Sequence, residues 1–118
     1  MRVLVADDEV SLATILCEVI QRKGHTVDVA YDGQKAFELI RSNAYDLAFL
    51  DFTMPEMTGI ELLQYIKEKN IGTRTVLITA YPFVEDYFAK ATGMDEFLAK
   101  PIQLTDIEKI LEKYKEKK

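Results

Sequence analysis

Apolar runs alternate with amphipathic stretches along this chain, and this alternation restricts its fold more than any other feature. Nearly continuous apolar runs predict strands at residues 2–6, 26–30, 46–50, 73–78 and 95–99. Helices are expected around residues 12–20, 36–40 and 60–66, more weakly at 84–91, and at 105–114, because apolar residues recur there every three or four positions. Strands without a polar face need cover on both sides. The pattern therefore predicts a parallel sheet with helices on both faces.

Length and composition restrict the class of protein further. All 118 residues are assigned to one domain, 1–118, of a common size. The net charge of −5, from 15 basic and 20 acidic residues, argues against direct binding of nucleic acid. No apolar run approaches the ~20 residues that span a bilayer, and the single cysteine, Cys17, excludes an internal disulfide. We therefore expect a cytoplasmic protein without a membrane segment.

Polar side chains follow four of the predicted strands, at the point where each run ends. Asp7 and Asp8 follow the first, Asp51 the third, Thr79 the fourth and Lys100 the fifth. The carboxyl ends of parallel strands lie on one edge, where open α/β sheets bind ligands. Crowded carboxylates cost stability unless a cation joins them, and Mg²⁺ takes oxygen ligands. The sequence therefore predicts a magnesium site that suits a phosphoryl group.

These residues, in this order, resemble the receiver domain of two-component response regulators, and the resemblance extends from Arg2 to the last helix. It rests on Asp7-Asp8, Asp51 with Met54-Pro55 and Gly59, Thr79-Ala80, and Lys100-Pro101. The resemblance implies a flavodoxin-like, doubly wound (βα)5 fold with a five-stranded parallel sheet of order 2-1-3-4-5. It also implies a stand-alone signalling receiver, not an enzyme beyond its own phosphorylation and dephosphorylation.

The resemblance gives the acidic residues their roles. Asp51 would accept a phosphoryl group from a phosphohistidine on a partner, either a histidine kinase or a histidine phosphotransfer protein. Asp8, Asp51 and the backbone carbonyl of Thr53 would bind Mg²⁺, and Asp7 would act largely through water. The phosphorylated form would then alter partner binding or pass the phosphoryl group on in a phosphorelay.

The remaining motif residues would respond to the phosphoryl group. By the same resemblance, Lys100 would pair with its oxygens, the hydroxyl of Thr79 would bond one of them, and Phe97 would change rotamer with Thr79. The peptide bond between Lys100 and Pro101 is expected to be cis, as is usual in the family. Gly33, which follows Asp32, is interpreted as a turn glycine.

Partner docking is expected beside the mouth of the pocket. Ser11, Leu12 and Ile15 flank it at the start of the first helix, and Pro101 and Ile102 flank it after the last strand. Exposed apolar residues beside a site often bind partners. Leu12 and Ile15 also continue the apolar stripe of the helix, so burial in the core is the alternative for these two.

Hydrolysis of the phosphoryl group is expected to be slow. In the family, the positions occupied here by Thr53 and Tyr81 flank the approach of the attacking water. Neither side chain offers a carboxylate or amide that could orient water, and the ring of Tyr81 can occupy its path. The alternative is that Pro82 turns Tyr81 away and leaves the approach open.

Two other classes of protein stay open at this point. A magnesium-dependent phosphatase of the aspartyl-phosphate type also uses an aspartate nucleophile, but normally has a second aspartate two residues later, where this chain has Thr53. A flavodoxin-like cofactor binder would need a phosphate-cradling loop after the first strand. The acidic run Asp7-Asp8-Glu9 would repel phosphate there unless a metal intervened.

Overall fold

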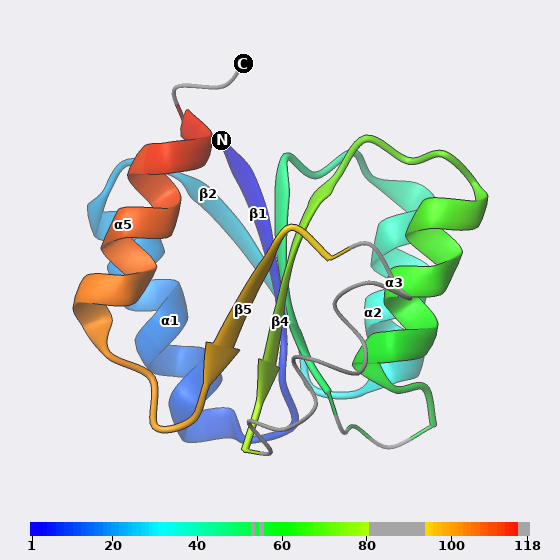
Figure 1. The fold of residues 1–118 in the computed structure, drawn as a ribbon, viewed down its shortest axis with the longest axis horizontal. Coiled ribbons are helices and arrows are strands. Elements are labelled where there is room, and N and C mark those ends of the chain that lie inside the picture. Colours follow the sequence, from blue (N-terminus) through cyan, green and yellow to red (C-terminus); the bar gives the residue numbers. More distant parts are fainter. Residues whose placement is uncertain (53, 55, 81–93, 116–118) are drawn as a thin grey trace.

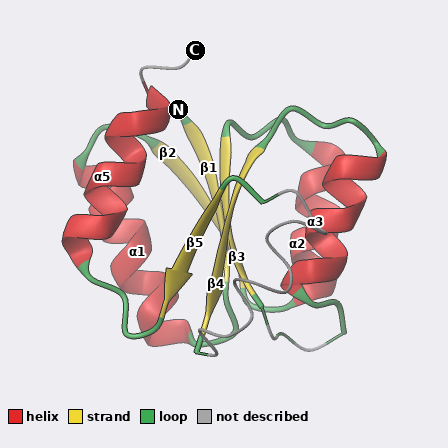
Figure 2. Cartoon of the chain, in the orientation of Figure 1, coloured by secondary structure: helices red, strands yellow, loops and turns green. Residues whose placement is uncertain are grey.

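The computed structural model describes residues 1–52, 54, 56–80 and 94–115. In this part of the chain, a parallel sheet lies between two pairs of helices (Figure 1, Figure 2). The strands are β1 (Arg2–Ala6), β2 (Thr26–Ala30), β3 (Leu47–Asp51), β4 (Arg74–Thr79) and β5 (Glu96–Ala99). The helices are α1 (Val10–Arg22), α2 (Gly33–Ser42), α3 (Gly59–Glu68) and α5 (Leu104–Lys115). The helix expected at 84–91 lies outside the described residues.

The order of the strands confirms the predicted topology. It is β2-β1-β3-β4-β5, and every neighbouring pair is parallel. The chain runs from β1 outward to β2 and returns past β1 to β3, so the winding reverses between β1 and β3. Open α/β sheets bind ligands beyond the carboxyl ends of the strands at such a reversal. Ala6 pairs with Leu50, so Asp7 and Asp51 follow the last pair of these two strands.

The hydrophobic core forms two layers, one on each face of the sheet. Helices α1 and α5 cover one face, and α2 and α3 cover the other (Figure 1). Val3 and Val5 belong to the first layer, while Leu4 and Ala6 belong to the second. Since alternate residues of a strand point to opposite faces, β1 is buried on both sides. This double burial is why the strand runs are almost continuously apolar.

The ends of three predicted strands were wrong by one residue. Strands β3 and β4 begin and end one residue later than predicted, and β5 begins at Glu96. The cause is hydrogen-bonded pairing, which continues past the apolar run to join Asp51 with Ile78 and Thr79 with Ala99. Two polar residues of the predicted site are therefore held by the sheet itself. Among the described residues, no helix has the length and apolarity that a membrane span requires.

Candidate metal and phosphoryl site

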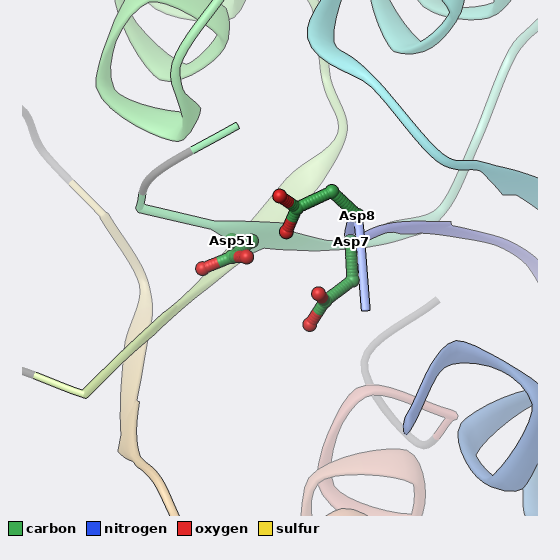
Figure 3. A group of neighbouring side chains, drawn as sticks. All are labelled: Asp7, Asp8 and Asp51. Carbon is green, nitrogen blue, oxygen red and sulfur yellow. The ribbon is translucent and has the colours of Figure 1, made fainter. Parts of the chain in front are cut away.

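Three carboxylates meet at the carboxyl-terminal edge of the sheet. Figure 3 shows Asp7 and Asp8, directly after β1, and Asp51, at the end of β3, around a common space. One carboxylate oxygen from each residue lies within 4.8 Å of the others. Asp7 and Asp51 are buried, with 0% and 3% of their surface exposed, whereas Asp8 is exposed. The acids that the sequence places at strand ends are thus brought together.

Lys100 places an ammonium group beside these acids. Its Nζ lies 3.6 Å from Oδ2 of both Asp7 and Asp51, and 3.5 Å from Oε1 of Glu9. Burial disfavours the charged ammonium, but the carboxylates of Asp51, Asp7 and Glu9 outweigh burial and raise the pKa of Lys100. One ammonium group therefore faces several carboxylates, so the site has fewer cationic than acidic groups among the described residues.

The carboxylate of Asp7 shows most directly that the described part of the site is short of positive charge and hydrogen-bond donors. Its Oδ1 accepts a hydrogen bond of 2.9 Å from the backbone N–H of Glu9. Its Oδ2 is buried and accepts no hydrogen bond from the described residues, since the 3.6 Å to Lys100 is an ion-pair distance beyond hydrogen-bond range. A buried oxygen left in this way costs about 1–3 kcal/mol or more if charged. Together with Asp8 and Asp51, it fits a hard cation that takes oxygen ligands.

The same surroundings change the acidity of Asp51. Burial, and next the carboxylate of Asp7, raise the pKa of Asp51 to about 7, although Lys100 acts in the opposite direction. A cation in the common space would favour the ionised carboxylate and reverse this shift. The site is thus arranged for a positive ligand, and the ionised form of Asp51 is the form that can act as a nucleophile.

Thr79 and Lys100 lie on the two strands next to β3. Thr79 ends β4 with 1% of its surface exposed, and its carbonyl accepts a 2.8 Å hydrogen bond from the N–H of Lys100. Phe97 is half-buried two residues before Ala99, the partner of Thr79 in the sheet. Phe97 and Thr79 therefore point to the same face of the sheet. The peptide bond between Lys100 and Pro101 is cis, as the resemblance implied.

Described residues of the segment after Asp51 bond to the sheet and to one another. The N–H of Phe52 donates to the carbonyl of Ile78 at 2.7 Å, and the N–H of Gly59 donates back to the carbonyl of Phe52 at 3.2 Å. Thr58 caps α3 reciprocally with Glu61, which fixes where the helix begins. A methyl group added to Gly59 would overlap the carbonyl of Asp51. The start of α3 therefore lies tightly against the end of β3.

A hollow of about 440 Å³ adjoins the site and is lined by Glu9, Leu12, Lys100, Pro101 and Ile102. Three of the predicted docking residues, Leu12, Pro101 and Ile102, thus share one surface. Leu12 and Ile102 are also partly buried against the core. Ser11 and Ile15 are exposed on α1 beside this hollow without lining it, and Ile15 has 46% of its surface exposed.

Two predicted site residues are not described by the structure, and one residue of the site was not predicted. Thr53 and Tyr81, the residues expected to influence hydrolysis, lie outside the described residues. Glu9 was missed as a member of the site, although its position directly after the acid pair and before α1 could have indicated it. Its side chain contacts Lys100, which lies near the other end of the sequence, so this pair forms only in the folded chain.

An open parallel sheet thus carries clustered acids, a lysine and a buried threonine at its carboxyl edge, which is the arrangement expected from the resemblance to receiver domains. The family described as the response regulator receiver domain matches residues 3–112, and the chain belongs to this family. The transcriptional regulatory protein ZraR of Escherichia coli is 37% identical over 112 residues, and DltR of Streptococcus agalactiae is 32% identical over 108. These matches cover 94% and 91% of this chain but only 25% and 48% of the two relatives.

Solved structures agree with this assignment. The receiver domain of the Francisella response regulator 1452 has a TM-score of 0.90 and 33% identity, covering 99% of this chain and 98% of that chain. The response regulator TrrA of Thermotoga maritima, in complex with Mg²⁺ and BeF, has a TM-score of 0.86 and 30% identity, with 96% and 97% covered. Both similarities extend over nearly the whole chain.

Proposed function

We propose that this receiver is a cytoplasmic signalling module controlled by phosphorylation of Asp51. The donor is a phosphohistidine on a histidine kinase or a histidine phosphotransfer protein. The observation that carries the proposal is the meeting of three carboxylates with Lys100 around a buried Asp7 oxygen that lacks a hydrogen bond within the described residues. The phosphorylated form alters partner binding or passes the phosphoryl group on.

Mg²⁺ is the cofactor that this set of oxygens fits. Asp8, Asp51 and the backbone carbonyl of Thr53 would hold it, and Asp7 would act largely through water. When bound, the cation supplies neutralisation of the charge on the phosphoryl oxygens. The complex of the related TrrA with Mg²⁺ and BeF supports this assignment.

Asp51 is the residue that forms a covalent bond during transfer of the phosphoryl group. A carboxylate oxygen of Asp51 attacks phosphorus, a P–O bond forms, and the P–N bond to the imidazole breaks, with its electron pair returning to the ring nitrogen. The Nζ of Lys100, 3.6 Å from Oδ2 of Asp51, would pair with the phosphoryl oxygens. The hydroxyl of Thr79 would then bond a phosphoryl oxygen, and Phe97, which shares its face of the sheet, would change rotamer.

Incubation with a small acyl phosphate and Mg²⁺ tests the proposal. By intact-protein mass, the wild type is expected to gain one phosphate and hold it, whereas Asp51→Asn gains none. Asp28→Asn is the matched control, because it changes an acid on β2 that bonds to Tyr45 and Arg2 instead, and it is expected to react normally. Continuous release of phosphate without a phosphorylated protein would favour a phosphatase and contradict the receiver proposal.

The docking of the donor can be tested separately. We expect the donor to contact the hollow beside the site through Leu12, Pro101 and Ile102, with Ser11 and Ile15 at its margin. Leu12→Ala should slow transfer from a phosphohistidine partner and leave phosphorylation by a small acyl phosphate normal. Leu39→Ala, partly buried on the opposite layer, serves as the control. Unchanged transfer from the partner to Leu12→Ala would show that the donor docks elsewhere.

The lifetime of the phosphoryl group is a further element of the proposal. Thr53 and Tyr81 offer no carboxylate or amide that could orient water, and the ring of Tyr81 can occupy the path of the water. Misplacing an attacking group can slow a step by ~10²-fold. Loss of phosphate from purified phosphorylated protein should therefore accelerate in Tyr81→Ala and in Tyr81→Glu. Equal decay rates in the wild type and both variants would mean that Tyr81 does not control hydrolysis.

A further inference from the structure

Gly33 lies in the first turn of α2 and meets the loop that follows the phosphoacceptor. The interpretation as a turn glycine was wrong, since Gly33 opens the helix and Asp32 caps it, accepting a 2.7 Å hydrogen bond from the N–H of Lys35. A methyl group added to Gly33 would overlap the carbonyl of Met57 and lie 2.6 Å from its Cα. Position 33 therefore has no room for a side chain beyond that of glycine.

This contact is the third support of the loop between β3 and α3. The other two are hydrogen bonds described above, from the N–H of Phe52 to the carbonyl of Ile78 and from the N–H of Gly59 to the carbonyl of Phe52. Between them, Glu56 adopts a left-handed backbone with φ of 71°, a conformation that residues other than glycine rarely take. Phe52 and Gly59 are thus held at the end of the sheet, and Met57 is held against α2.

The contact with α2 has little freedom to adjust. Both partners are backbone, so no side-chain rotation can relieve an overlap. Ala36 and Ile40 anchor α2 in the core, with 0% and 3% of their surface exposed. Any side chain at position 33 must therefore displace Met57, and with it the turn that brings Gly59 against the carbonyl of Asp51.

We propose that Gly33 is a positioning residue for the metal and phosphoryl site. Its close contact with Met57 keeps the segment from Met57 to Gly59 against the end of β3. This inference rests on the proposed function, in which Asp51 and the backbone carbonyl of Thr53 hold Mg²⁺. The nearest atoms that a methyl group at position 33 would meet belong to Met57 and not to Asp51. The effect of Gly33 passes through Met57 and Gly59 to the backbone of Asp51.

Gly33→Ala tests the inference, with Gly72→Ala as the matched control because an added methyl there meets nothing within 4 Å. Calorimetric titration of metal-free protein should show Mg²⁺ binding weakened by about 10-fold or more in Gly33→Ala, as for other groups that support metal ligands. Hydrogen exchange at the Gly59 amide should be faster in the same variant without metal. Gly72→Ala should change neither. Affinity and exchange within about 2-fold of wild type in Gly33→Ala would overturn the inference, since groups that support metal ligands change affinity by more than this.

Ile40→Val distinguishes the loss of positioning from a loss of overall stability, because it weakens the packing of the same helix seven residues after Gly33. It should retain the Mg²⁺ affinity of the wild type, and an equal loss would overturn the inference. If Gly33→Ala does not fold in buffer, the titration is made in trimethylamine N-oxide, which favours the folded state. Failure of the wild type to bind Mg²⁺ would contradict the proposed function, whereas normal binding by both proteins would contradict only the role of Gly33.

Discussion

The two ends of the sheet use carboxylates in opposite ways. At the amino-terminal edge, formed by Arg2, Asp28, Asn43, Tyr45 and Asp46, the acids have partners. Asp28 accepts hydrogen bonds from Tyr45 at 2.7 Å and Arg2 at 3.2 Å, and Asp46 accepts from the N–H of Arg2 at 2.8 Å. At the carboxyl-terminal edge, the buried acids share one lysine, and an oxygen of Asp7 accepts no hydrogen bond from the described residues.

Because of this difference, polar contacts that stabilise the fold lie toward one end of the strands, and charges that can bind a ligand lie at the other. The guanidinium of Arg2 also donates to Asn43 at 2.8 Å and lies 5.2 Å from the centre of the Tyr45 ring, and Thr73 donates to the carbonyl of Tyr45 at 2.8 Å. These contacts join the start of β1 to β2 and to the segment that precedes β3. The carboxyl-terminal edge instead keeps charge available for a ligand, at some cost in stability.

The largest expected effect is at Tyr45, which is 5% exposed. Tyr45→Ala should lower the free energy of unfolding by about 3–5 kcal/mol, because it removes a buried ring. Tyr45→Phe keeps the ring and removes only the hydrogen bond to Asp28, so it should cost about 1 kcal/mol. Urea denaturation measures both. No loss in Tyr45→Phe would show that the hydrogen bond at this edge does not stabilise the fold.

Magnesium should have the next largest effect. Free Mg²⁺ at a hundred times its dissociation constant should stabilise the wild type by about 2.7 kcal/mol through mass action. Asp8→Asn should be more stable than the wild type without metal and respond much less to Mg²⁺, because one of three clustered charges is removed. Asp46→Asn, at the amino-terminal edge, should keep the full response. Thermal melts with and without Mg²⁺ decide this, and a lower melting temperature for metal-free Asp8→Asn would contradict it.

Stability without metal should also depend on pH through Asp51. Its pKa rises from 3.8 to about 7 on folding, so the folded state binds this proton more tightly than the unfolded chain does. The resulting stabilisation is complete below the unfolded value and is lost as the pH rises through about 7. The melting temperature of metal-free wild type should therefore fall by a few degrees from about pH 5 to about pH 8, relative to Asp51→Asn. Parallel curves for the two proteins would exclude this effect.

The smallest effect is expected at an exposed ion pair. Arg74 lies 3.5 Å from Asp95, and its side chain is 54% exposed. Arg74→Ala should change the free energy of unfolding by about 0.5 kcal/mol or less. Asp95→Ala should cost more, because Asp95 also accepts a 2.9 Å hydrogen bond from the N–H of Thr75. A larger loss in Arg74→Ala, measured by urea denaturation, would show that this exposed ion pair stabilises the fold.

The carboxyl-terminal edge could be predicted from the sequence because its residues follow directly from local pattern. Asp7, Asp51, Thr79 and Lys100 come where apolar runs end, and the carboxyl ends of parallel strands must share an edge. Local pattern could not show that β3 continues to Asp51, since that end depends on pairing with β4. The fold was thus predictable to within about one residue at these strand ends, within the usual uncertainty of such boundaries.

The remaining features depend on contacts between residues distant in the sequence. The contact between Gly33 and Met57 arises from how α2 packs against a loop, and the pair of Lys100 and Glu9 joins opposite ends of the chain. The hydrogen bond from Tyr45 to Asp28 likewise joins different strands and leaves no periodic signal. The amino-terminal edge was therefore not anticipated, although it supplies the more completely satisfied polar network.

The contrast between the two edges is tested most directly by thermal unfolding of metal-free Asp51→Asn and Asp28→Asn at about pH 8, where the wild-type Asp51 is largely ionised. Both changes replace one acid by its amide. The account predicts opposite signs: a higher melting temperature for Asp51→Asn, because crowded buried charge is relieved, and a lower one for Asp28→Asn, because the ion pair with Arg2 is lost. A lower melting temperature for both variants would contradict the claim that the carboxyl-terminal edge holds its charge at the expense of stability.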